Sequence, residues 1–171
     1  YGRGEFIMTT TALLTEKDIE KCLEIYNYYI KNTSFSLEEE ELSPEAYRAQ
    51  VAGITERYPF IVAHDESGEA VGFAYLNVFN ERSAYRHTAD LSIYVDSNHT
   101  HEHIGEILLA ALEKLATDYG ITNIISIITD INTASVKFHE KHGFVREGRI
   151  ADIAIKFGKS CGIYYYRKKL I

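Results

Sequence analysis

The residues best suited to chemistry lie in a short loop between an apolar strand and a long amphipathic helix. The loop holds His99, His101, Glu102 and His103, and Gly105 then opens the helix. A helix that begins directly after such a loop points its backbone N–H groups and the positive end of its dipole at whatever lies above the loop, and phosphate groups bind there. The arrangement therefore predicts a phosphate site, although this loop contains one glycine and no Lys or Arg.

The same histidines raise the alternative of a metal site. Alternating histidines on an extended loop can converge on one ion, with Glu102 as a neighbouring ligand. The spacing His99-x-His101-x-His103 matches no standard zinc pattern, and the sequence offers no obvious second ligand cluster. We therefore expect no metal, and histidines that simply face solvent are the plainer interpretation.

A second group of polar residues follows a nearly unbroken run of Ile and Ser over residues 121–129. Such a run is typical of a strand buried on both faces beside a parallel neighbour. After it come Asn132, Ser135 and His139, in a short predicted helix that Gly143 ends. Asn132 is a good helix N-cap, and an imidazole such as that of His139 can exchange a proton near pH 7.

The elements that must position these groups follow from the hydrophobic pattern and the turn signals. The predicted order is α-α-β-β-β-α-β-α-β-β, preceded by a short strand at residues 10–14, and it indicates one mixed α/β domain over residues 8–171. We interpret residues 1–7 as a remnant of an expression vector and Met8 as the native start. Strand candidates are residues 59–64, 70–78, 86–95, 121–129, 144–149, 150–157 and 162–170.

Composition excludes several classes of protein. The apolar fraction of 46% is ordinary for a globular domain, and no apolar run is long enough for a membrane span. The net charge of −7 argues against a nucleic-acid partner. Of the two cysteines, Cys22 lies on an apolar helix face and is expected to be a buried thiol. We expect a cytoplasmic protein.

Eight short segments occur in a characteristic order: residues 25–27 (IYN), 32–35 (NTSF), 58–63 (YPFIVA), 71–74 (VGFA), 85–95 (YRHTADLSIYV), 104–105 (IG), 132–144 (NTASVKFHEKHGF) and 156–159 (KFGK). In this order and spacing they resemble the GNAT superfamily of N-acetyltransferases, and within it the phosphinothricin and methionine sulfoximine acetyltransferase group. The resemblance extends over essentially the whole chain from about Thr10.

The resemblance implies a mixed sheet that splays between its fourth and fifth strands, here 91–95 and 124–129, with acetyl-CoA in the wedge. The pyrophosphate is expected on backbone amides of the loop before the next helix. The residues implied in cofactor binding are Ile93, Tyr94, Val95, His101, Glu102, His103, Ile104, Gly105, Glu106 and Asn132.

The loop departs from the family pattern Gln/Arg-x-x-Gly-x-Gly/Ala. Thr100 stands at the first position and His103 at the first glycine, while Gly105 is retained. A side chain at His103 is expected to hinder close approach of the backbone to phosphates, and Glu102 and Glu106 place negative charge nearby.

For catalysis, the resemblance implies Asp90 as the general base and His139 as the group that protonates the leaving thiolate. Phe35, Arg82 and Ser92 are implied on the acceptor side, where Arg82 would pair with a carboxylate or phosphinate. We therefore predict transfer of acetyl from acetyl-CoA to the amine of a small amino acid or analogue by direct attack, in a homodimer. The alternative is a protein of the same fold that binds a ligand or partner without turnover.

Overall fold

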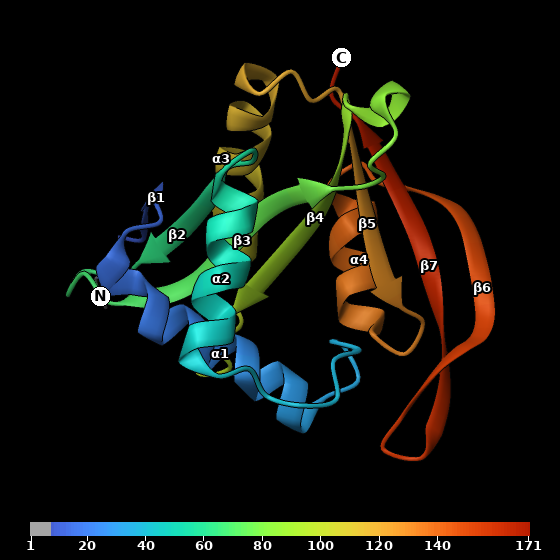
Figure 1. Cartoon of the computed structure of the whole chain (residues 1–171), viewed down its shortest axis with the longest axis horizontal. Coiled ribbons are helices and arrows are strands. Elements are labelled where there is room, and N and C mark those ends of the chain that lie inside the picture. Colours follow the sequence, from blue (N-terminus) through green and yellow to red (C-terminus); the bar gives the residue numbers. More distant parts are fainter. Residues whose placement is uncertain (1–7) are drawn as a thin grey trace, which may run out of the picture.

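The computed structural model of the 171-residue chain describes residues 8–171 (Figure 1). Residues 1–7, interpreted above as a vector remnant, lie outside the described residues. One seven-stranded sheet has the order β1-β2-β3-β4-β5-β7-β6. Its strands are β1 (Thr10–Leu13), β2 (Phe60–His64), β3 (Ala70–Val78), β4 (Thr88–Val95), β5 (Asn123–Thr129), β6 (Val145–Lys156) and β7 (Lys159–Lys169).

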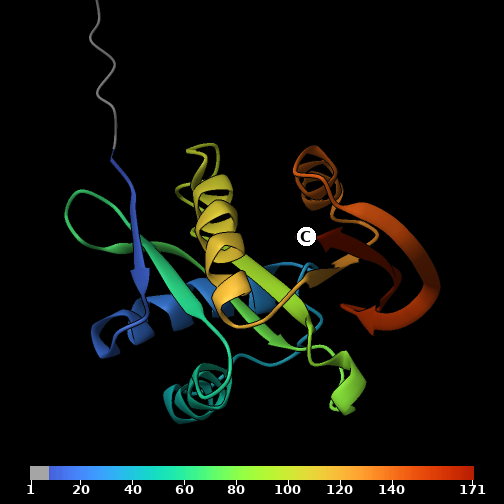
Figure 2. The same cartoon turned by 90° about the horizontal axis from the view of Figure 1, so that it is seen from above.

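Four α-helices cover the two faces of this sheet. Figure 2 shows α3 (Ile104–Asp118) and α4 (Thr133–Lys141) on one side, and α1 (Ile19–Asn32) and α2 (Pro44–Thr55) on the other. Local sequence explains their starts. Ser43 accepts a hydrogen bond from the N–H of Ala46, and Asn132 caps α4 in the same way.

The strands separate between β4 and β5, as expected. These strands are parallel, and they pair only from Thr88↔Asn123 to Asp90↔Ile125. Beyond that point β4 runs on to Val95 beside β3, and β5 runs on to Thr129 beside β7. Each strand therefore presents an unpaired backbone edge to the gap between them.

The C-terminal strands differ from the prediction. Residues 144–149 and 150–157, two separate strand candidates in the sequence, form the single strand β6, and β7 begins at Lys159 rather than at residue 162. The register against β7 shifts twice, and Asp152 in the second shift has a φ of 51°. A bulge bends a strand and interrupts its alternation, so one continuous strand looks like two in the sequence.

The core lies on both sides of β2–β5. Large buried side chains such as Tyr47, Phe60, Phe73 and Leu112 fill it, and the thiol of Cys22 is buried within it, as predicted. The close packing of α3 on β3 depends on Gly72, where an added Cβ would lie 3.1 Å from Ile104 Cγ2 and 3.2 Å from Leu108 Cδ1. Among the described residues, no helix is both long and apolar enough to cross a bilayer.

Candidate active site

A cavity of about 490 Å³ fills the gap between the diverging strands and extends to the starts of α3 and α4. Most residues that the sequence nominated lie on its wall. Three do not: Asp90, Glu102 and Arg82 are absent from the lining. The nominated residues that line the cavity are Phe35, Ser92, Ile93, Tyr94, Val95, His101, His103, Ile104, Gly105, Glu106, Asn132 and His139.

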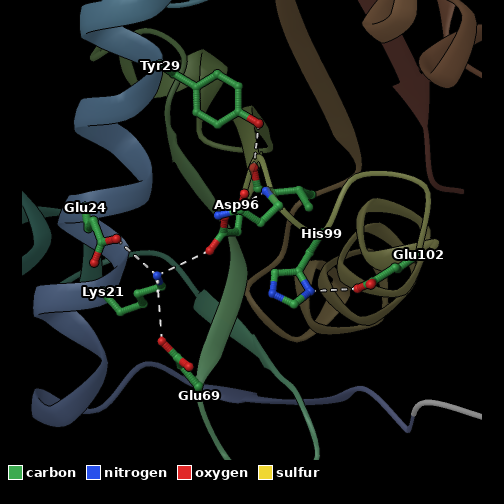
Figure 3. Close-up of polar contacts among 9 residues, drawn as sticks. Lys21, Glu24, Tyr29, Glu69, Asp96, His99 and Glu102 are labelled. Carbon is green, nitrogen blue, oxygen red and sulfur yellow. Dashed lines mark hydrogen bonds and ion pairs between the residues drawn. The ribbon is translucent and has the colours of Figure 1, made fainter.

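The end of β4 is held in place by side chains of α1 (Figure 3). The Tyr29 hydroxyl donates a hydrogen bond to the carbonyl of Val95 at 2.5 Å, and Lys21 Nζ lies 3.3 Å from the Asp96 carboxylate. The same carboxylate accepts the N–H of Asn98, and the Asp96 carbonyl accepts the N–H of His99. The first turn of the histidine loop is therefore fixed to α1 through Asp96.

Two histidines of the loop adopt the left-handed backbone conformation that glycine normally takes. The φ angle is 78° at His101 and 59° at His103. The His103 side chain is 74% exposed and turns toward Glu106, so the ring points largely into solvent. The loop thus reaches a glycine-like path without glycine, at a cost in backbone strain of order 1 kcal/mol per residue.

The acidic residues of the loop are paired. Lys141 Nζ lies 2.7 Å from the Glu106 carboxylate and holds the pKa of Glu106 below its usual range. Glu102 accepts a hydrogen bond from His99 at 2.9 Å (Figure 3) and does not line the cavity. Within residues 8–171, no group of three or more His, Cys, Asp or Glu side chains is placed to hold a metal ion.

Packing against α4 explains why Gly105, the retained glycine of the loop, has no side chain. A Cβ there would lie 3.3 Å from the Phe138 ring of α4, closer than side chains normally pack. The glycine therefore allows the first turn of α3 to approach α4, and both helix N-termini open into the same cavity.

Asp90 is the last residue of β4 that pairs with β5. Burial raises the pKa of Asp90 to about 7, although a hydrogen bond from the Leu91 N–H lowers it in part. The carboxylate does not line the cavity. Ser92, two residues on and on the same face of the strand, does line it and lies opposite Tyr75 of β3. Asp90 therefore lies close to the cavity without forming part of its lining.

His139 lines the cavity but is only 5% exposed. Its Nδ1 lies 2.7 Å from the carbonyl oxygen of Ser135, so Nδ1 carries the proton and donates. Its Nε2 then accepts from the Ser126 hydroxyl at 2.9 Å. Burial lowers the pKa of His139 below its ordinary value of 6.5, which the Ser135 contact offsets only in part. The imidazole is therefore neutral at pH 7, and the lone pair of its Nε2 accepts the hydrogen bond from Ser126.

The loop between α1 and α2 contributes to the cavity wall. Phe35 of this loop lines the cavity, and the neighbouring Ser36 carbonyl accepts a hydrogen bond from Lys156 at 2.7 Å. Lys156 is 2% exposed and comes from the far end of β6. Arg82, which the resemblance placed here, is instead exposed before the short helix Ser83–Tyr85 and lines no part of the cavity.

Sequence reasoning missed two residues that matter to this geometry, Ser126 and Tyr29. Ser126 is 4% exposed on β5 and contacts His139, and Tyr29 holds Val95. A serine in a run of isoleucines was a usable signal, because a buried hydroxyl requires a partner. Tyr29 carried no such signal, since an aromatic residue on an apolar helix face is ordinary core.

The comparisons with known proteins agree with this geometry. The family model described as acetyltransferase (GNAT) domain matches residues 12–161. YwnH of Bacillus subtilis (strain 168), provisionally named a phosphinothricin acetyltransferase, is 33% identical over 150 residues, covering 88% of this chain and 92% of that protein. The L-methionine sulfoximine/L-methionine sulfone acetyltransferase of Pseudomonas paraeruginosa (strain DSM 24068 / PA7) is 29% identical, covering 83% of each.

A solved structure with the same fold contains the co-substrate. The phosphinothricin acetyltransferase of Sinorhizobium meliloti, in complex with acetyl-CoA, superposes with a TM-score of 0.91 at 28% identity, covering 94% of this chain and 88% of that one. A ribosomal-protein-alanine N-acetyltransferase from Brucella melitensis has a TM-score of 0.90 at 30% identity, covering 94% and 99%.

The residues around the wedge fit acetyl-CoA. Past Asp90, the backbone of β4 has no partner strand on its β5 side and can hydrogen-bond to an extended pantetheine arm. Thr129 Oγ1 on the opposite wall is buried with no hydrogen-bond partner among residues 8–171, and the N-terminus of α3 faces the phosphate position. The chain therefore belongs to the GNAT family and is an acetyl-CoA-dependent N-acetyltransferase.

Proposed function

We propose that the protein acetylates the amine of a small amino acid or analogue of the phosphinothricin and methionine sulfoximine type. The observation that carries this proposal is the group of residues on the α1 side of the cavity. Phe35 and Ser92 line it, and Tyr75 of β3 lies opposite Ser92. Relatives named phosphinothricin N-acetyltransferase and L-methionine sulfoximine/L-methionine sulfone acetyltransferase support the same substrate class.

In this proposal Asp90 removes the proton from the substrate ammonium. Its half-buried carboxyl has a pKa of about 7, so the carboxylate is basic enough to deprotonate an amine and is still substantially ionised at neutral pH. Because Asp90 does not line the cavity, the proton passes through Ser92 or a water beside it. His139 on the opposite strand-and-helix wall returns a proton to the sulfur that leaves.

We propose direct attack of the amine on the thioester in a ternary complex. Neither cysteine lines the cavity: Cys22 lies in the core between α1 and α2, and Cys161 lies on β7. Burial raises the pKa of the Cys22 thiol to about 12, so it is a poor nucleophile. The two buried free thiols also support a reducing, cytoplasmic setting.

An assay of CoA release tests the proposed substrate class. Acetyl-CoA would be offered with phosphinothricin, methionine sulfone, methionine sulfoximine and the common L-amino acids, and with their N-acetylated forms as matched controls. We expect CoA release only with free amines of small amino acids. Release with a peptide that begins with alanine, and not with any free amino acid, would overturn the proposed class.

The protein is also proposed to form a homodimer through β6, the outermost strand. Its exposed face is apolar, with Ile153 at 53% and Ile155 at 70% exposure, and an apolar edge strand is prone to pairing with another chain. Sedimentation equilibrium should show a dimer that Ile155→Lys shifts to monomer. The matched control, Leu13→Lys at the opposite edge of the sheet, should leave the dimer intact, and a monomeric wild-type protein would contradict the proposal.

A further inference from the structure

Ser126 occupies a distinctive place in the wedge. It is the first residue of β5 beyond the last pair with β4, Asp90↔Ile125, and so it stands at the apex where the two strands part. It lines the cavity together with Leu91 and Ser92 from the facing strand. A thioester whose carbonyl carbon must meet an amine deprotonated by way of Asp90 has to lie at this apex.

The hydroxyl of Ser126 and the imidazole of His139 both line the cavity and are hydrogen-bonded to each other. The hydroxyl donates to Nε2 at 2.9 Å, while Nδ1–H donates to the Ser135 carbonyl at 2.7 Å. The rings of Phe144 and Tyr166 pack near the imidazole, and His142 of the same helix is the nearby group whose charge disfavours a second proton on it. In the resting enzyme, Ser126 and neutral His139 can therefore accept a proton from the cavity at Ser126 Oγ, but they hold no extra proton that they could donate.

We propose that Ser126 is a catalytic residue, and that Ser126 and His139 together carry a proton from the attacking nitrogen to the departing sulfur. This deepens the proposed role of His139 and rests on the proposed function. As the C–N bond forms, Ser126 Oγ accepts the second proton of the nitrogen and passes its own to His139 Nε2. As the C–S bond breaks, Nε2–H returns its proton to Ser126, whose hydroxyl protonates the thiolate.

The protons balance in this scheme. His139 begins and ends neutral, and Ser126 begins and ends as a hydroxyl. The ammonium proton taken by way of Asp90 is the one that is released to solvent. The transient imidazolium is stabilised by the Ser135 carbonyl, which accepts from Nδ1 throughout. The scheme explains why a histidine held neutral by burial can still serve a step that requires an acid.

Kinetics with the best amine from the panel test the shuttle. Ser126→Ala should lower kcat about 100-fold with little change in the KM for acetyl-CoA, and Ser126→Thr should restore most of it. In the wild type the acid limb of log kcat against pH should approach a slope of two, because Asp90 must be ionised and His139 neutral. In Ser126→Ala that slope should fall to one. Ser135→Ala, which retains the carbonyl, should lose several-fold less activity.

A second measurement needs no acceptor. The thiol of CoA bound to the protein can be titrated by the ultraviolet absorbance of its thiolate. In the wild type the bridging Ser126 hydroxyl can stabilise the thiolate and link it to His139, so the thiol should ionise at lower pH than in Ser126→Ala, where this hydroxyl is absent. Calorimetric binding of CoA to both proteins verifies that the variant retains its site.

The proposal is overturned if the kcat of Ser126→Ala stays within about threefold of the wild type, or if the bound thiol titrates alike in both proteins. A wild-type protein that acetylates none of the small amines would remove the proposed substrate class instead. In that case the thiol titration still decides whether the Ser126–His139 connection exists.

Discussion

Asp90 is a residue at which catalysis and stability oppose each other. Its pKa is raised by burial from 3.8 to about 7, so the folded state holds this proton more tightly than the unfolded chain does. The resulting contribution to stability is complete below the unfolded pKa of 3.8 and is lost as pH rises through about 7. The ionised carboxylate, which the proposed general base requires, is therefore the form that destabilises the folded protein.

Asp90→Asn should separate these two effects. The amide resembles the protonated carboxyl. At about pH 8 the variant should therefore unfold at a higher temperature than the wild type, and its free energy of unfolding should be larger by on the order of 2 kcal/mol. At about pH 3, below the unfolded pKa of 3.8, the two proteins should unfold alike. Scanning calorimetry at both values measures this, while kcat should drop at least about 100-fold. If the variant were less stable than the wild type at both pH values, the ionised Asp90 carboxylate would not be destabilising and this explanation would be wrong.

His103→Gly tests the histidine in place of the loop glycine. The φ of 59° costs a non-glycine residue about 1 kcal/mol, and glycine removes both this strain and the Cβ near the phosphate position. We expect acetyl-CoA to bind several-fold more tightly, as measured by calorimetry. His103→Ala removes the ring but retains the Cβ and the strain, so it should gain less. Weaker binding by the glycine variant would show that the imidazole itself contributes.

At the scale of elements, α1 acts as the anchor of the histidine loop. Lys21 contacts the Asp96 carboxylate at 3.3 Å, and Asp96 organises the turn that follows β4 (Figure 3). Lys21→Met should loosen this turn and raise the Kd for acetyl-CoA by about three- to tenfold, because the amides of the loop are then less ordered. Lys31→Met, an exposed lysine at the end of the same helix, is the control for lost charge. Equal affinity in both variants would contradict an anchoring role.

The order of the elements was predictable from hydrophobic periodicity and caps. Ser43-Pro44 and Asn132 mark their helices because a side-chain cap is a local interaction. β6 was divided in two because its bulges break the alternation that defines a strand. The splay after Asp90↔Ile125 involves two strands whose paired residues lie 35 positions apart in the sequence. It was predicted from the family resemblance, because the sequence of neither strand alone indicates it.

The sequence predicted those parts of the candidate site that depend on the course of the backbone. It was less informative about contacts between side chains of different elements. Ile93, Tyr94 and Val95 line the cavity because they continue a strand beyond its partner. Arg82 lies outside the cavity lining, a position that the sequence did not indicate because nothing local fixes the direction of the loop after β3. The contact of Ser126 with His139 joins β5 to α4, and such a contact is set by packing that no spacing encodes.

The molecule as a whole consists of two parts that meet at the wedge. β1–β4 with α1–α3 carry the pyrophosphate loop and Asp90, whereas β5–β7 with α4 carry Ser126 and His139. Only three residue pairs of β4 and β5 join the sheet across this line, so the two parts need further contacts to stay aligned. Lys141 with Glu106 and Lys168 with Glu113 join them on the α3 side, and the hydrogen bond from Lys156 to Ser36 ties the end of β6 to the loop after α1.

Lys156→Met therefore tests how the two parts are held together. The lysine is buried, its pKa is lowered by that burial, and its ammonium ties down the loop that places Phe35 on the acceptor end. We expect the KM for the amine to rise about tenfold, with a smaller change in the KM for acetyl-CoA, because the Ser36 carbonyl loses a charged partner worth about 1.5–3 kcal/mol. Lys159→Met, an exposed lysine at the start of β7, should leave both KM values unchanged. Lys156→Arg should recover part of the affinity if the cation is what holds the loop, and equal increases in both KM values would show a general loss of structure instead.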